Sequence, residues 1–169
     1  MKSINDEFLE IMANYQGIVH KVNLVYFRSA SEREENFQEI MYQLWKSFPE
    51  LKKRDSLGSW VYKVAINTSI SRIRKASRIE YRHKLPDICD KTVDTAEAIS
   101  RNTSLQMLLE AVSNLDEIDR SIMLLWLDEN SYDQIAGIIG ISPSNVGVRI
   151  NRAKETLRKL MNTTNHGKQ

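Results

Sequence analysis

The chain has 169 residues, of which 41% are hydrophobic and 27% charged, a composition typical of one or two small globular domains. A single cysteine excludes a disulfide framework, and six glycines and three prolines argue against a turn-rich sandwich or barrel. The longest apolar run, residues 122–127, is too short to span a membrane, and the acidic N-terminus does not fit a signal peptide. We therefore expect a cytoplasmic protein without membrane insertion.

The net charge of +2 conceals two basic segments separated by an acidic one. Residues 56–84 carry seven basic side chains against one acidic, and residues 143–169 carry six against one. Between them, residues 85–142 carry three basic side chains against eleven acidic. This distribution indicates either two contacts with a polyanion or two solvated helix faces, and charge alone does not choose between them.

In the N-terminal half, apolar residues recur in steps of three and four, which predicts helices over residues 5–27, 32–48 and 57–84. Pro49 is expected to end the second helix. The predicted apolar stripes are Phe8, Met12, Tyr15, Val19, Val22 and Tyr26 in the first helix, Phe37, Ile40, Met41, Leu44, Trp45 and Phe48 in the second, and Leu57, Trp60, Val61, Val64, Ala65 and Thr68 in the third.

The acidic residues 85–104 lack a strong apolar period and are predicted to form a linker between two domains, residues 1–84 and 105–169. The second domain begins with a short amphipathic helix that ends near Leu115, and Asp116 is placed to cap the next one. No useful run of β-alternation occurs anywhere. The predicted fold class is all-α, with two small helical domains joined by a linker.

Residues 131–160 carry the strongest local pattern in the chain. Ser131 and Gln134 fit a capping box that opens a helix, and Gly140 suits the left-handed position that stops it. Ser142 and Pro143 then start another helix as its cap and first residue. Two helices separated only by a short turn that contains glycine predict a helix-turn-helix.

The second helix of this pair separates its apolar and polar residues. Its apolar stripe is Val146, Ile150, Ala153, Leu157 and Leu160, and its other faces carry Ser144, Asn145, Arg149, Asn151, Arg152, Lys154 and Arg158. Polar side chains near the N-terminus of such a helix can reach base edges, while arginines further along hold phosphates. The alternative is an ordinary helical hairpin with a solvated basic face. Gly147 marks either a close approach of DNA or a tolerated cost in helix stability.

Three segments resemble the extracytoplasmic-function (ECF) group of bacterial sigma factors. Residues 35–46, ENFQEIMYQLWK, are similar to its polymerase-binding helix, usually D-L-V-Q-E-x-F-x-x-L-W, and residues 57–67, LGSWVYKVAIN, resemble its F-x-x-W-L-Y-x-I-A-x-N helix. Residues 131–158 follow its L-S-Y-x-E-I-A helix-turn-helix pattern. The resemblance covers nearly the whole chain. It departs from the family at Asn36, where leucine is usual, and at Asn145, Gly147 and Val148 on the recognition helix.

The resemblance implies a sigma region 2-like domain that binds core RNA polymerase and the minus-ten element, and a region 4-like domain that reads the minus-thirty-five element. It assigns polymerase binding to Gln38, Glu39 and Trp45, although the apolar stripe favours a core position for Trp45. Residues 48–57 correspond to a loop that captures a flipped base, with Asn67 nearby, and Trp60 is favoured as a core residue. The implied DNA-binding residues are Lys53, Arg54, Lys63, Asn67, Arg72, Arg74, Lys75, Arg78, Ser144, Asn145, Arg149, Arg152 and Arg158.

An enzymatic function finds no support in the sequence. His20, His83 and His166 are scattered, Cys89 has no second cysteine, and no glycine-rich phosphate loop is present. We therefore expect no cofactor, no metal and no small-molecule substrate. The partners implied by the resemblance are core RNA polymerase, promoter DNA and an anti-sigma factor. The main alternative is a dimeric helix-turn-helix regulator with an N-terminal sensing domain, and a second is an interaction module that has lost DNA contact.

Overall fold

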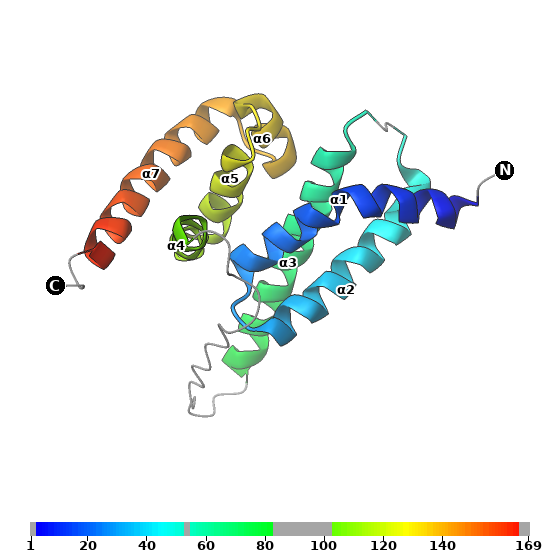
Figure 1. Ribbon diagram of the computed structural model, residues 1–169, viewed down its shortest axis with the longest axis horizontal. Coiled ribbons are helices and arrows are strands. Elements are labelled where there is room, and N and C mark those ends of the chain that lie inside the picture. The colour runs from blue at the N-terminus through cyan, green and yellow to red at the C-terminus, as the bar shows by residue number, and fades with distance from the viewer. Residues whose placement is uncertain (1–2, 53–54, 83–102, 166–169) are drawn as a thin grey trace. The chain divides into compact units, whose positions relative to one another are not determined.

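The structure is a computed structural model that describes residues 3–52, 55–82 and 103–165. The chain divides into two compact units, residues 1–94 and 95–169, and each is described by itself. Every regular element in the described ranges is a helix, in agreement with the predicted all-α class (Figure 1). None of the described helices combines the length and the apolar content that crossing a bilayer requires.

The first unit consists of three long helices and one short 3₁₀ helix. These are α1 (Ile4–Tyr26), α2 (Ala30–Ser47), η1 (Phe48–Glu50) and α3 (Leu57–Arg82). Helix α3 packs against both α1 and α2, which also contact each other (Figure 1). The fully buried apolar side chains at this junction include Val19 and Val22 from α1, Ile40 and Leu44 from α2, and Val61 and Ala65 from α3.

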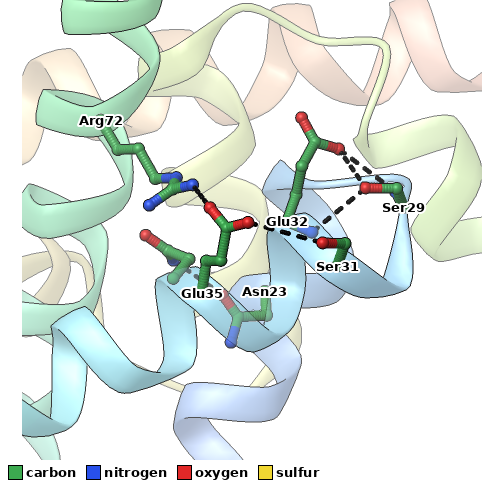
Figure 2. A network of polar contacts seen from close by, with 7 residues as sticks. Asn23, Ser29, Ser31, Glu32, Glu35 and Arg72 are labelled. Atoms are coloured by element: carbon green, nitrogen blue, oxygen red, sulfur yellow. Dashed lines mark hydrogen bonds and ion pairs between the residues drawn. The ribbon is translucent and has the colours of Figure 1, made fainter.

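Helix α2 starts two residues earlier than the apolar pattern predicts. Ser29 is its N-cap: the Ser29 hydroxyl accepts a hydrogen bond from the Glu32 backbone N–H, and the Glu32 carboxylate accepts from Ser29 in return (Figure 2). This capping box satisfies backbone donors that the apolar period cannot reveal. The helix ends at Ser47, and Pro49 lies within η1 rather than directly after α2.

Helix α3 buries a wider face than its predicted stripe. Tyr62 and Ile66, which the sequence places on other sides of the helix, are almost fully buried. The reason is that α3 is covered by two helices, so its buried surface extends around more of its circumference.

The second unit consists of α4 (Thr103–Val112), α5 (Glu117–Leu127), α6 (Tyr132–Ile139) and α7 (Pro143–Asn165). Helix α7 contacts each of the other three and contributes Val146 and Ile150 to a core shared with Ile122, Leu125 and Ile135. Asp116 caps α5 as predicted, accepting from the backbone N–H groups of Ile118 and Asp119. Helix α4 ends at Val112 rather than near Leu115, and Leu160 is 36% exposed at the outer end of the predicted stripe.

Candidate functional site

The predicted helix-turn-helix is formed by α6 and α7. The backbone N–H of Ser131 donates to the Gln134 side chain at 2.8 Å, and the Gln134 N–H donates to the Ser131 hydroxyl at 3.2 Å. Gly140 ends α6 with φ of 84°, in the left-handed region that favours glycine. The Ser142 hydroxyl then accepts from the Asn145 N–H at 3.2 Å, and α7 begins at Pro143. The local sequence therefore fixes both helix ends and the turn between them.

One face of α7 is open to solvent. The exposed side chains include the predicted DNA-binding residues Ser144, Asn145, Arg152 and Arg158, together with Val148. Asn145, Val148 and Arg152 follow one another at spacings of three and four, so they share one side of the helix. Lys154 lies elsewhere: its ammonium is 4.0 Å from the centroid of the Trp126 ring. That side chain is engaged within the unit by a cation–π contact.

Arg149 is partly buried against α5. Its guanidinium forms an ion pair with Asp119, and its Nη1 lies 3.8 Å from an oxygen of Asp116. The Arg149 side chain is 29% exposed and that of Asp119 is 19% exposed. Burial raises the pKa of Asp119, and this effect outweighs the lowering by its hydrogen bond to Arg149. The structure thus engages one predicted DNA ligand inside its own unit.

Gly147 has an intramolecular neighbour that the sequence does not reveal. A Cβ atom built at this position would lie 3.3 Å from a carbon of the Tyr132 ring in α6. The missing side chain therefore gives the tyrosine room to lie beside α7. This contact offers a third reason for the glycine, besides the close approach of DNA and simple tolerance.

The outer face of α2 carries the three residues assigned to polymerase binding. Gln38 and Glu39 are exposed, and Trp45 is 51% exposed. The Trp45 indole N–H donates to the Asn5 side chain of α1 at 3.3 Å, and Tyr42 is also exposed close by on α2. The core position favoured for Trp45 is wrong, because the buried stripe of α2 runs through Asn36, Ile40 and Leu44 instead.

On α3, Lys63 and Asn67 are exposed, as are the predicted phosphate ligands Arg74, Lys75 and Arg78. Trp60 is half-buried, and its ring lies 6.2 Å from that of Phe48. Trp60 therefore packs against the core residue Phe48 without being fully buried itself. Lys53 and Arg54 lie outside the described residues.

Arg72 is paired with an acidic residue of the neighbouring helix. Its guanidinium forms an ion pair with Glu35 of α2 (Figure 2). The guanidinium also lies 6.0 Å from the centroid of the Phe27 ring. The Glu35 side chain is 59% exposed and also accepts from the Ser31 hydroxyl. Because that carboxylate is largely solvated, salt screens this pair more strongly than a buried one.

A buried polar cluster in the first unit is missing from the predicted sites. The Asn36 side-chain amide donates to the Asn23 oxygen at 2.7 Å and to the Ser69 hydroxyl at 2.9 Å. All three residues are buried, and each comes from a different helix. One feature of the sequence could have indicated this cluster: Asn36 occupies a position where the family has leucine, and it continues the spacing of the apolar residues Ile40 and Leu44.

Two family descriptions match the chain, in the order that the three motifs predict. Sigma-70 region 2 matches residues 11–79, and sigma-70 region 4 matches residues 105–157. Together the two matches span most of the sequence. The first lies within the unit of α1 to α3, and the second covers most of α4 to α7.

The chain is also similar to named sigma factors over most of its length. It is 23% identical to the ECF RNA polymerase sigma factor SigW of Bacillus subtilis, over 95% of this chain and 91% of that protein. It is 26% identical to the RNA polymerase sigma factor YlaC of the same organism, over 73% of this chain and 74% of that protein.

Among solved structures, the fold resembles that of the sigma factor RpoE of Bartonella quintana, determined in complex with the anti-sigma factor NepR. The TM-score is 0.74 at 20% identity, covering 96% of this chain and 98% of that one. At 20% identity, this similarity shows a shared fold and nothing further. With both sigma regions matched in order, the chain belongs to the sigma-70 family and to its ECF group, the initiation factors that direct RNA polymerase to subsets of promoters.

Proposed function

We propose that this sigma factor divides its work among three helix surfaces: α2 binds core RNA polymerase, α3 contacts the minus-ten element and α7 reads the minus-thirty-five element. The observation that carries the proposal is the coincidence of two sigma regions on one chain with exposed candidate residues on each of these helices. A dimeric regulator accounts for the helix-turn-helix but not for region 2, so the findings favour the sigma factor.

The proposed polymerase surface consists of Gln38, Glu39 and Trp45. Tryptophan is among the residues that most often dominate binding energy at protein interfaces, since its large ring becomes desolvated on contact. A ring already buried in the domain core would not be available for such a contact. The 51% exposure of Trp45 therefore supports its role at the interface.

The proposed minus-ten surface lies on α3 and the loop before it. Lys63 and Asn67 are exposed toward the start of α3, and Arg74, Lys75 and Arg78 follow in its second half. A solvated amide such as that of Asn67 can hydrogen-bond the edge of an unstacked base, while the basic side chains hold phosphates. The assignment of Lys53 and Arg54 in the loop remains part of this proposal.

The proposed minus-thirty-five surface is the open face of α7. Ser144 and Asn145 lie in its first turn, where side chains of a recognition helix reach base edges in the major groove. Arg152 and Arg158 lie further along and are suited to phosphate contacts, which supply affinity and salt dependence.

The domain division 1–84, 85–104 and 105–169 belongs to the same proposal. A 20-residue linker extends to at most about 66–72 Å, which is roughly two turns of B-DNA. One chain could therefore reach two promoter elements while docked on polymerase. We place this activity in the cytoplasm, where the polymerase acts, and assign no catalytic step to the chain. An anti-sigma factor is the proposed inhibitor, as the RpoE–NepR complex illustrates for another sigma factor.

Transcription in vitro tests the proposal directly. Purified core polymerase is incubated with genomic fragments, with and without this chain, and the transcripts are mapped. We expect new start sites that appear only when both proteins are present. Stable binding of a twofold complex to an inverted repeat, with no association with core enzyme, would contradict the proposal.

A further inference from the structure

The ion pair between α5 and α7 bears on how the recognition helix meets DNA, and the inference drawn from it rests on the proposed function. We infer that Arg149 is a positioning residue rather than a DNA ligand. Asp119 holds the Arg149 guanidinium on α5, and this pair sets the orientation in which α7 presents Asn145, Val148 and Arg152.

The place of Arg149 on its helix supports this role. Arg149 follows the buried Val146 by three residues and precedes the buried Ala153 by four, so it stands at the border of the buried stripe. Its side chain leaves that border toward the N-terminal turn of α5, where Asp116 and Asp119 lie. The exposed DNA-facing side begins with the residues next to it, among them Asn145 and Arg152.

The burial of Asp119 makes release of Arg149 unfavourable. The Asp119 side chain is 19% exposed, and burial already raises the pKa of its carboxyl. If Arg149 moved to a DNA phosphate, Asp119 would remain as a partly buried charge without its strongest partner. Asp116 would not replace that partner, since its own negative charge also raises the pKa of Asp119.

The ion pair between Arg72 and Glu35 in the first unit differs from this one in the exposure of its acidic residue. Glu35, the partner of Arg72, is 59% exposed, so water solvates its carboxylate when the arginine leaves. Arg72 is therefore able to exchange its partner for a phosphate at low cost, whereas Arg149 is not. Between Arg72 and Arg149, only Arg72 keeps its place among the proposed DNA ligands.

With Arg149 fixed, the side chains left to read bases are those that the helix exposes. Val148 is 46% exposed between Asn145 and Arg152 on the same side of α7. An apolar side chain at this place suits contact with a thymine methyl group, while the asparagine can hydrogen-bond an adenine edge. A small change in the orientation of α7 would misplace both contacts.

A double-mutant cycle in the full chain, without DNA, tests the pairing. Calorimetry of D119A, R149A and D119A/R149A follows the unfolding transition of the second unit. Each single substitution is expected to lower the Tm of this unit by about 4–8 °C. The Tm loss of the double variant is expected to be no larger than the smaller of the two single losses. Losses that simply add would overturn the inference.

DNA binding separates a positioning residue from a ligand. The probe is a duplex that the wild-type chain, together with core polymerase, enriches from a randomised pool. Its affinity is compared with that of a scrambled duplex, at a temperature well below the Tm of every variant. We expect R149A and D119A to lower the preference for the enriched duplex at least about fivefold. Both variants should leave the salt slope unchanged, that is, the slope of the logarithm of the binding constant against the logarithm of salt concentration. The matched control R152A is expected to reduce that slope by about one.

Two results would overturn the positioning role. One is a loss of about one in the salt slope of R149A, and the other is tighter binding of both duplexes by D119A, as expected if the freed Arg149 became a phosphate ligand. If no duplex is enriched, or R152A keeps the wild-type slope, the proposed function fails instead. The unfolding cycle then still decides whether Asp119 and Arg149 act together.

Discussion

At the scale of single residues, the first unit depends on a polar contact inside an apolar core. Asn36 is fully buried and donates to both Asn23 and Ser69, whose own hydroxyl donates to the Ala65 carbonyl. The Asn36 oxygen has no hydrogen-bond partner among the described residues. Such a cluster favours one arrangement of the three helices, because a shift of any helix leaves further buried groups without partners.

The substitution N36L tests this cluster and is expected to destabilise the first unit by about 1–3 kcal/mol, even though leucine is the usual family residue. The reason is that the buried Asn23 oxygen would lose its donor. The double variant N23L/N36L removes both polar groups and is expected to recover part of that loss. Urea unfolding measures both values, and a fully stable N36L protein would contradict the assigned role.

A second residue-scale prediction concerns pH. Because burial raises the pKa of the Asp119 carboxyl above its ordinary value, the folded state binds this proton more tightly than the unfolded state. The contribution of Asp119 to stability is therefore fully present below the unfolded pKa and is lost as pH rises through the folded one. The free energy of unfolding of the wild type minus that of D119N is therefore expected to be larger at about pH 3.5 than at pH 7. A difference that grows with rising pH would contradict this sign.

At the scale of elements, two glycines of the helix-turn-helix have opposite roles. Gly140 holds φ of 84° in the turn, where an L side chain is strained, so G140A is expected to cost about 1–2 kcal/mol. Gly147 lies within α7, where alanine gains up to about 1 kcal/mol in helix propensity. Its close neighbour is the Tyr132 ring, which is 42% exposed and has room to shift.

We therefore expect G147A to be neutral or slightly stabilising, while G140A is destabilising. Thermal unfolding of the two variants side by side measures this difference. The Y132A background provides the control, since removing the ring should release the full propensity gain of G147A. Equal destabilisation by both glycine substitutions would show that the Tyr132 contact cannot adjust.

At the scale of the whole molecule, the exposed surface of α2 is the means by which a small initiation factor joins a much larger enzyme. The substitution W45A is expected to weaken binding to core polymerase about 10- to 30-fold, as for a tryptophan at the centre of an interface. Its Tm should change little because the side chain is 51% exposed. The matched control is L9A, which removes an even more exposed apolar side chain from α1. Fluorescence anisotropy of labelled chain with core enzyme measures the affinities, and equal effects of the two variants would contradict a specific surface.

The sequence by itself determined the helical class, the order of the helices and the capped turn of the helix-turn-helix. These features depend on local signals: apolar residues repeat every three or four positions, and a cap contacts a backbone group three residues away. Ser131, Gly140 and Ser142 are where the local rules place them. The exposure of Gln38 and Glu39 follows from the same period.

Only the tertiary structure decided which of the candidate side chains are available. Trp45 fits the apolar period but faces outward, Asn36 is polar but faces the core, and Arg149 is basic but pairs with a residue thirty positions earlier. Each outcome depends on the helices that pack nearby, and these are distant in the chain. A one-dimensional pattern identifies the face of a helix, whereas burial and pairing depend on what covers that face.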